Sequence, residues 1–264
     1  MSRVSEVFNN SRKIVVKIGS NVLAGKDGIL DKSVVARIVT QMNDLIEDGK
    51  QVILVSSGAG VSGAGLIDKL SRRNDINYKQ ALCAIGQVEL MMEYKKHFSE
   101  IGKIVGQLLL TTDNFSDDSS TLNIRNTLFT LIDEGVVPII NENDSVCTIE
   151  MSPGDNDNLA ALTANLWAAD LLILMSDVDG VYDSSPKHNS DANLIHEIDM
   201  KSIDNVIEEI DTNGKSRFGT GGMDSKIEAA KTVREYGIPM LIVNGNNEKM
   251  IEDAKNGVSG TLFI

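Results

Sequence analysis

Short, continuous apolar segments alternate along this chain with longer segments in which apolar residues recur at helical spacing. We expect the continuous segments to be β-strands, at 13–18, 51–55, 104–110, 136–140, 171–175 and 239–243. Strands that are apolar on both faces are typical of parallel sheets covered by helices on both sides. The amphipathic segments predict helices near 31–48, 78–99, 118–134, 156–168, 222–236 and 247–255.

Glycines mark the ends of several predicted helices. Gly49, Gly102, Gly135 and Gly237 each follow a helical segment closely. Glycine is favoured there because it adopts the left-handed backbone that ends a helix. Strands that alternate with helices imply right-handed crossovers, so we predict a doubly wound α/β sheet.

The composition sets limits on the class of protein. The 264 residues, 42% of them apolar, are enough for one large core. The four prolines form no linker, so we expect a single α/β domain.

The net charge of −13 argues against non-specific binding of nucleic acid or of an acidic membrane. This net charge does not exclude an anionic substrate, because nearby lysines could hold it. We find no apolar run long enough to span a membrane and no signal peptide, and expect a cytoplasmic protein.

The cysteines and histidines suggest no metal site. Cys83 and Cys147 form no CxxC motif, and both stand among small or apolar residues. We expect both to be buried thiols in a reducing compartment. His97, His188 and His196 are too scattered along the chain to indicate a metal site.

Polar residues and glycines gather where the predicted strands end. In a doubly wound sheet, ligands bind beyond the carboxyl ends of the strands. Four strand ends here carry such residues, at 17–21, 56–60, 141–144 and 176–180. We therefore expect these segments to converge on one crevice.

The most informative of the polar segments starts the helix predicted near 156–168. Asp155, Asn156, Asp157 and Asn158 crowd carboxylates and amides into successive positions. One of them would be enough to cap the helix, so a polar cap leaves at least two unexplained. We expect the others to hold a polar ligand. Asp157 could orient a lysine or a metal ion, and the helix N-terminus favours an anion nearby.

Two lysines stand in positions that favour a function. Lys17 interrupts the apolar strand 13–18, where an unpaired lysine would be costly to bury. It therefore needs a partner or faces a ligand at the end of the strand. Lys226 ends the glycine-rich segment 219–226, whose backbone donors could hold a polyphosphate. A surface turn with a solvated lysine explains that segment equally well.

Other nucleotide-binding motifs do not fit. Gly58–Gly63 matches GxGxxG, but no second strand that ends in an acidic residue follows it, which argues against a nicotinamide or flavin enzyme. Its glycines more plausibly let backbone N–H groups approach a carboxylate or phosphate. The chain lacks the GxxxxGK[ST] motif and the protein-kinase HRD and DFG triplets. The segment 177–183 lacks the spacing of a calcium loop and suits the rim of a nucleotide pocket.

Taken together and in this order, the motifs resemble the amino acid kinase family over essentially the whole chain. The matching segments are 15–20, 55–59, 137–146, 154–158 and 219–226. The segments 141–144 and 154–158 separate the branch that phosphorylates glutamate from aspartokinases, acetylglutamate kinases and uridylate kinases.

The resemblance implies a three-layer α/β/α sandwich with a mostly parallel central sheet. It implies a single domain over 1–264, with glutamate in the N-terminal half and ATP in the C-terminal half. The γ-phosphoryl group of ATP would pass, with Mg²⁺, to the γ-carboxylate of L-glutamate. The product would be L-glutamyl 5-phosphate, the first intermediate of proline biosynthesis. The alternatives are another acid acceptor, aspartate-like or carbamate-like, and a non-catalytic protein on the same fold. The non-catalytic protein would lack one of Lys17, Asp157 and Lys226.

The resemblance also assigns residues. Lys17 and Lys226 would flank the transferring phosphoryl group as catalytic residues, with the catalytic Asp157 orienting them. Glutamate contacts would be Ser57, Gly58, Asn141, Asp144, Asp155 and Asn156. ATP contacts would be Lys17, Ser176, Asp177, Thr220, Gly221, Gly222, Met223, Asp224, Ser225 and Lys226. No protein ligand of Mg²⁺ is assigned.

The predicted chemistry suits these residue types. A carboxylate is already nucleophilic, so the reaction needs positioning and charge neutralisation but no general base. Asp144 suits the α-ammonium group of the substrate. Many family members carry Thr where Ser176 stands, and the hydroxyl is kept.

Many family members also continue into a C-terminal PUA domain, which we do not expect in this chain. The resemblance further implies a homo-oligomer and feedback inhibition by proline.

Overall fold

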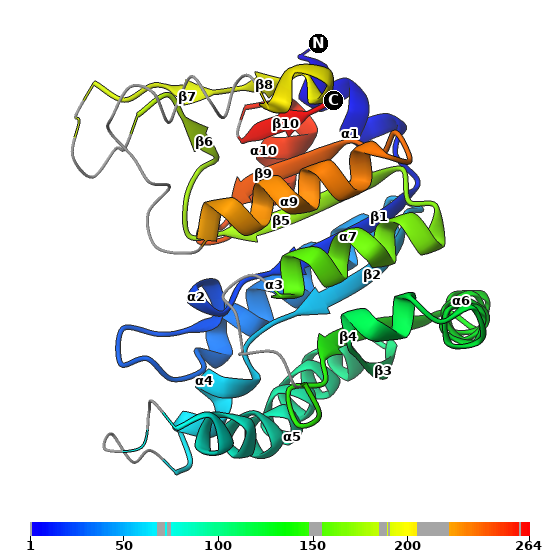
Figure 1. Cartoon of the computed structure of the whole chain (residues 1–264), viewed down its shortest axis with the longest axis vertical. Coiled ribbons are helices and arrows are strands. Elements are labelled where there is room, and N and C mark those ends of the chain that lie inside the picture. Colours follow the sequence, from blue (N-terminus) through cyan, green and yellow to red (C-terminus); the bar gives the residue numbers. More distant parts are fainter. Residues whose placement is uncertain are drawn as a thin grey trace.

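The computed structural model describes residues 2–67, 72, 75–147, 155–184, 189, 191–204, 222–258 and 260–264. Its main sheet has eight strands. In spatial order they are β3 (Ile104–Leu110), β4 (Val136–Glu142), β2 (Gln51–Ser56), β1 (Lys13–Ile18), β5 (Leu171–Ser176), β9 (Met240–Asn244), β10 (Thr261–Phe263) and β8 (Glu197–Ile198). Neighbouring strands are parallel except for β9 and β10, which pair in antiparallel register. The prediction of a mostly parallel α/β sheet is therefore confirmed (Figure 1).

Helices cover both faces of the sheet and form a three-layer sandwich (Figure 1). One face carries α1 (Arg3–Asn10), α3 (Lys32–Glu47), α5 (Ile76–Glu100) and α10 (Met250–Asn256). The other carries α6 (Asp118–Asp133), α7 (Asp155–Trp167) and α9 (Gly222–Arg234). Each face buries its own apolar core, because strands covered on both sides direct alternate side chains into each layer.

The predicted strands and helices are all present, with bounds that differ by a few residues. Gly49, Gly102, Gly135 and Gly237 have φ between 66 and 79°, as expected of glycines that end helices. Several short elements were not predicted: α1, α2 (Ser20–Leu23), α4 (Ala59–Ala64), β8, β10 and the hairpin of β6 (Val181–Tyr182) with β7 (Leu194–Ile195). Most are too short for a periodic pattern to stand out.

The alternation along β1 decides where Lys17 points. Ile14, Val16 and Ile18 pack into the core beneath α3 and α5, whereas Val15 packs beneath α7 and α9. Lys17 is two residues beyond Val15, so it faces the α7 and α9 side of the sheet.

The GxGxxG segment serves helix packing. A side chain at Gly63 of α4 would lie 2.0 Å from the Leu82 carbonyl oxygen, and one at Gly86 of α5 would lie 1.9 Å from the Ala59 carbonyl oxygen. These two glycines therefore let the backbones of α4 and α5 touch. Gly58 precedes α4 with φ +107°, a conformation that favours glycine.

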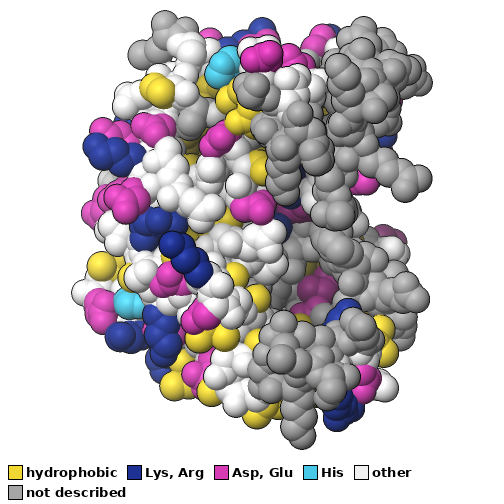
Figure 2. Space-filling model, turned by 90° about the vertical axis from the view of Figure 1, so that its left-hand side faces the viewer, with side chains coloured by type: hydrophobic (Ala, Val, Ile, Leu, Met, Phe, Trp, Pro, Cys, Tyr) yellow, Lys and Arg dark blue, Asp and Glu magenta, His cyan; other side chains and the backbone are white. Residues whose placement is uncertain are grey.

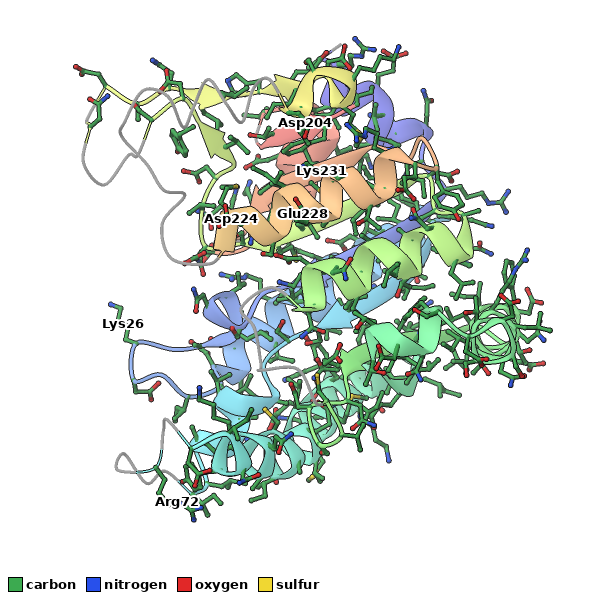
Figure 3. The ribbon with its side chains drawn as sticks, viewed as in Figure 1. Lys26, Arg72, Asp204, Asp224, Glu228 and Lys231 are labelled. Carbon is green, nitrogen blue, oxygen red and sulfur yellow. The ribbon has the colours of Figure 1, made fainter. Side chains whose placement is uncertain are left out.

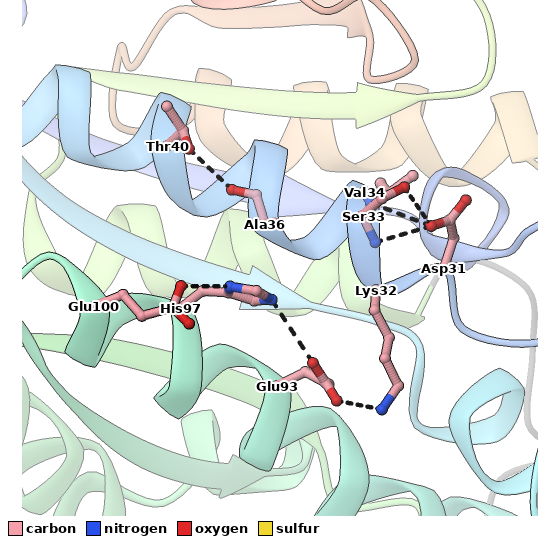
Figure 4. A network of polar contacts seen from close by, with 9 residues as sticks. All are labelled: Asp31, Lys32, Ser33, Val34, Ala36, Thr40, Glu93, His97 and Glu100. Atoms are coloured by element: carbon pink, nitrogen blue, oxygen red, sulfur yellow. Dashed lines mark hydrogen bonds and ion pairs between the residues drawn. The ribbon is translucent and has the colours of Figure 1, made fainter.

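Polar contacts join α3 to α5 on the face of the sheet that also carries α1 and α10 (Figure 4). Asp31 caps α3 by accepting from the Ser33 backbone N–H at 2.9 Å. The next residue, Lys32, forms an ion pair with Glu93 in the middle of α5. Glu93 lies in turn 3.7 Å from the His97 ring, measured from Oε2 to Nε2. The start of α3 is thereby tied to α5, which borders the site described next.

Candidate active site

A cavity of about 500 Å³ opens at the carboxyl ends of the parallel strands. Figure 2 looks onto this edge of the molecule and shows a hollow with acidic and basic side chains at its walls. Residues that follow β1, β2, β4 and β5 all reach the cavity, as do the first turns of α7 and α9. The predicted convergence of four strand ends on one crevice is therefore confirmed.

An ion cluster of Lys17, Asp157 and Lys226 lies at the centre of this cavity. Asp157 is 1% exposed, and its Oδ1 lies 2.6 Å from the Lys17 Nζ. Its Oδ2 lies 3.2 Å from the Lys226 Nζ. Lys17 comes from β1, Asp157 from α7 and Lys226 from α9, so one carboxylate joins three elements. The expectation that Lys17 has a partner is confirmed.

The charges in this cluster do not balance. Burial acts to raise the pKa of Asp157, but the ammonium groups of Lys17 and Lys226 outweigh it and hold the pKa below the ordinary 3.8. Burial lowers the pKa of Lys17, against the opposing effect of Asp157. Two ammonium groups thus share one ionised carboxylate. At this cluster the wall therefore carries a local excess of positive charge, which suits an anionic group, while Glu142, Asp144 and Asp177 make other parts of the cavity lining acidic.

The first turn of α9 holds Lys226 in place. The Lys226 ammonium donates to the Gly222 carbonyl at 2.7 Å, in addition to its contact with Asp157. The Ser225 hydroxyl donates to Asp157 Oδ2 at 2.7 Å. Gly222, Ser225 and Lys226, three of the predicted ATP contacts, all line the cavity.

The predicted glutamate contacts lie together at the other side of the cluster. Ser57, Gly58, Asn141, Asp144 and Asn156 all line the cavity. Asn156 and Asn141 each accept from the Glu142 backbone N–H, at 3.3 and 2.9 Å. The start of α7 is thereby attached to the end of β4.

The end of β5 completes the cavity. Ser176 donates to Asp177 at 3.2 Å, and Asn21 donates to the same carboxylate at 3.1 Å. Ser176, Asp177 and Asn21 all line the cavity. Asp177 is exposed as well as lining the cavity, so it lies at the rim of the cavity. The sequence predicts the segment 177–183 at the rim of a nucleotide pocket.

Some predicted site residues lie elsewhere. Met223 packs partly against the apolar core under α9. Asp224 is exposed at the first turn of α9 and is not part of the cavity wall (Figure 3). Thr220, Gly221 and the side chain of Asp155 lie outside the described residues.

Several cavity residues were given no individual role from the sequence. Asn21 and Glu142 lie within the segments 17–21 and 141–144, which were expected to reach the crevice, and their polar character at a strand end was a usable signal. Val61 lies within the Gly58–Gly63 segment and also lines the cavity, as does Cys83. Cys83 carried no signal, because a lone cysteine in a helical segment looks like a core position.

Within the described part of the chain, no group of three or more His, Cys, Asp or Glu side chains could hold a metal ion. Over the same residues, we find no helix with the length and apolarity needed to cross a bilayer. Neither Cys83 nor Cys147 forms a disulfide; Cys83 is buried as expected, whereas Cys147 is only half-buried.

A comparison of this chain with known proteins agrees with the fold. The chain belongs to the amino acid kinase family, whose model matches residues 12–244. Within that family it is 50% identical to the glutamate 5-kinase of Alkaliphilus oremlandii, over 99% of both chains. It is 52% identical to the glutamate 5-kinase of Alkaliphilus metalliredigens over 98% of both, and 42% identical to that of Clostridium acetobutylicum over 100% of this chain and 98% of the other.

Solved structures support the fold assignment. A carbamate kinase from Giardia lamblia bound to AMP-PNP superimposes with a TM-score of 0.69 at 16% identity, over 97% of this chain and 99% of the other. The UMP kinase from Ureaplasma parvum gives a TM-score of 0.66 at 19% identity, over 96% and 99%. At such identities the likeness concerns the fold alone.

Proposed function

We propose that this protein transfers the γ-phosphoryl group of ATP to the γ-carboxylate of L-glutamate, giving L-glutamyl 5-phosphate for proline biosynthesis. The observation that carries the proposal is the buried cluster in which Lys17 and Lys226 share Asp157. It is found in a chain that matches glutamate 5-kinases over nearly its full length. We therefore infer the acceptor, glutamate, from the relatives. We infer the type of reaction, phosphoryl transfer, from the ion cluster.

The cluster suits phosphoryl transfer to a carboxylate. An oxygen of the acceptor carboxylate forms a bond to the γ-phosphorus while the bond from that phosphorus to the β–γ bridging oxygen breaks, and ADP leaves. Negative charge on the phosphoryl oxygens is the main obstacle, so fixed cations are the main requirement. Lys17 and Lys226 are fixed by Asp157, and no residue has to accept a proton.

We assign the glutamate site to the side of the cavity that borders β2 and β4. Asp144 is half-buried there and suits an α-ammonium group. Asn141 and Asn156 offer amide groups beside it. Gly58 stands before the first turn of α4, where the initial backbone N–H groups of a helix have no partner within the helix and suit a carboxylate.

We assign ATP to the side that borders β5 and α9. Ser176, Asp177, Gly222 and Ser225 line that side. The proposed contacts of Thr220 and Gly221, which lie outside the described residues, belong to the same assignment, whereas Met223 and Asp224 are not part of the cavity wall. Kinases bind Mg²⁺ mainly through the substrate's phosphates and one or two carboxylates. Asp177 is the carboxylate on that side of the cavity that would hold Mg²⁺, and the ion would supply positive charge in addition to that of the lysines.

The proposal extends to the setting of the enzyme. We place the reaction in the cytoplasm, where ATP is available and free thiols such as Cys83 persist. We assign the whole activity to one domain, with the glutamate side built from residues before Asp157 and much of the ATP side from residues after it. A homo-oligomer and inhibition by proline are parts of the same proposal and rest on the family resemblance.

A trapping assay tests the proposed reaction. The purified protein is incubated with Mg²⁺, ATP and L-glutamate, and the acyl phosphate is trapped with hydroxylamine as the hydroxamate. We expect ATP-dependent hydroxamate with glutamate and little with L-aspartate or carbamate. Equal turnover with aspartate would favour the alternative acceptor, and no turnover with any acid would refute the proposal.

A further inference from the structure

Two side chains of α5 lie behind the proposed glutamate site. Cys83 and Gln87 are one helical turn apart, so they project from the same face of α5. The Gln87 Oε1 accepts from the Asn141 Nδ2 at 2.7 Å. Cys83 lies beside Asp144, and both residues line the same two cavities. Each of the two therefore adjoins one residue at or just after the end of β4.

The contact of Gln87 sets the orientation of the Asn141 amide. Asn141 is 2% exposed, and its Oδ1 accepts from the Glu142 backbone N–H at 2.9 Å. An oxygen acceptor at Gln87 selects the nitrogen end of that amide, and the backbone N–H selects the oxygen end. The amide is thus held in one of its two orientations before a ligand arrives.

Cys83 stands in the wall between two cavities. It lines the active-site cavity and also a second cavity of about 530 Å³ between α5 and β3, and Asp144 lines both. Burial and the adjacent Asp144 carboxylate raise the pKa of the Cys83 thiol, so at neutral pH it remains a neutral donor. The neutral thiol therefore offers Asp144 a hydrogen-bond donor from α5.

The backbone that carries the pair is itself restrained. Gly86 lies between Cys83 and Gln87 and touches the backbone of α4, where a side chain would lie 2.2 Å from the Gly63 nitrogen. An α-helix held at such a contact cannot shift without moving α4. The two side chains are therefore presented from a rigid element, which is what accurate positioning requires.

We infer that Cys83 and Gln87 are positioning residues that set the affinity for the amino acid acceptor, by holding Asp144 and Asn141 in their binding orientation. The inference rests on the proposed function, because it takes Asp144 and Asn141 as glutamate contacts. Neither positioning residue is required for the phosphoryl transfer itself.

Steady-state kinetics with the whole protein test the inference. In Cys83→Ala and Gln87→Met, we expect KM for glutamate to rise about three- to tenfold, the effect of losing one hydrogen bond. We expect kcat and KM for ATP to stay within about twofold. Cys83→Ser keeps a donor and should bring KM for glutamate back to the native value.

Two matched variants serve as controls. Gln107→Met changes a glutamine that lines the second cavity from β3, and Cys147→Ser removes the thiol of the other cysteine. Both should leave all kinetic constants near native. An unchanged KM for glutamate in folded Cys83→Ala and Gln87→Met would overturn the inference, as would equal increases in KM for glutamate and for ATP.

A spectroscopic signature separates this inference from the proposed function. In Cys147→Ser protein the infrared S–H stretch reports Cys83 alone. We expect that band to shift when Asp144→Asn replaces the carboxylate. Absence of glutamate turnover in the native protein would refute the proposed function, whereas an S–H band that does not move would refute the contact on which this inference depends.

Discussion

At the scale of single residues, the molecule is organised around one buried carboxylate. Asp157 is nearly inaccessible and contacts two ammonium groups and the Ser225 hydroxyl. Burying three charges costs free energy unless each finds partners. The three buried charges therefore contribute little to the stability of the fold. They are well suited to holding two cations at a fixed separation. Substitutions of Lys226 and Asp157 test that interpretation.

Lys226→Ala should lower kcat about 10²- to 10³-fold, the usual effect of removing a preorganised charge aimed at a transition state. KM for glutamate should change little, because Lys226 lies on the side of the cavity that we assign to ATP. Lys231→Ala is the matched control. It removes a lysine of the same helix whose ion pairs with Asp204 and Glu228 lie on the outer surface (Figure 3). Near-native kcat in Lys226→Ala would contradict the assigned role.

Asp157→Asn should abolish most turnover and also lower the free energy of unfolding by about 3–5 kcal/mol, because it leaves two buried cations without their counter-charge. The pKa of Asp157 is below 3.8 in the folded protein, so its stabilising contribution is complete above pH 3.8 and is lost as the pH falls through the folded pKa. The difference in stability between native protein and variant should therefore be constant at neutral pH and shrink in acid. Denaturant unfolding at several pH values measures it.

The exposed Asp204 provides the control for that experiment. Its ion pair with Lys231 lies at the surface, so Asp204→Asn should change stability little at any pH. If Asp157→Asn behaves like Asp204→Asn and keeps normal turnover, the carboxylate neither orients the lysines nor balances their charge.

Asp144→Ala and Asn156→Ala should raise KM for glutamate and leave KM for ATP nearly unchanged. Each variant leaves a polar group of the substrate unpaired, which costs about 1–3 kcal/mol. Kinetics with each substrate varied in turn distinguish the two constants. A loss of ATP affinity in place of glutamate affinity would show that the two sides of the cavity are assigned the wrong way round.

At the scale of elements, the close contact of α4 and α5 shapes the side of the cavity that we assign to glutamate. The glycines of the GxGxxG segment were expected to let backbone approach a ligand. The structure shows that Gly63 lets α4 approach α5, with Gly86 as its counterpart. Gly58 still opens the turn before α4 with its positive φ. One motif thus combines a packing role with a role at the cavity.

Gly86→Ala should destabilise the protein by about 3 kcal/mol or more, at or above the upper end of the range for overpacking, because the added methyl group meets rigid backbone. Gly60→Ala is the comparison, since its methyl group would lie at an ordinary 3.6 Å from the Cys83 Sγ. That variant should be as stable as the native protein, or more stable by up to about 1 kcal/mol from helix propensity. Equal stability of the two variants in denaturant would contradict the close contact.

At the scale of the whole molecule, the order of the strands brings the two substrate sides together. β1 lies between β2, which ends on the side that we assign to glutamate, and β5, which ends on the side that we assign to ATP. A ligand on either side therefore contacts elements from distant parts of the sequence. Binding to the folded protein alone must raise its stability by linkage.

L-Glutamate and a non-hydrolysable ATP analogue should each raise the melting temperature. At a concentration of about 100 Kd, either one adds about 2.7 kcal/mol to the free energy of unfolding. L-Aspartate at the same concentration should have little effect. Thermal unfolding monitored by circular dichroism provides the measurement, and an equal shift with aspartate would argue against a glutamate-specific site.

The sequence by itself determined the main elements and the edge of the sheet where the site would lie. Apolar periodicity is a local property, and so is the preference of Gly49 and Gly135 for a left-handed backbone. The need of Lys17 for a partner was also visible, because a charge within an apolar strand is costly wherever the strand packs. The family motifs added the identity of that partner as an expectation.

Only the tertiary structure decided which side chains meet. The position of Lys17 beside Asp157 depends on the alternation along β1 and on α7 crossing the same face of the sheet. Cys83 and Gln87 lie in the middle of a long helix and carried no local signal, yet they contact Asp144 and Asn141. Such contacts join residues far apart in the chain, and their geometry is set by the packing of whole elements, which local sequence patterns do not contain.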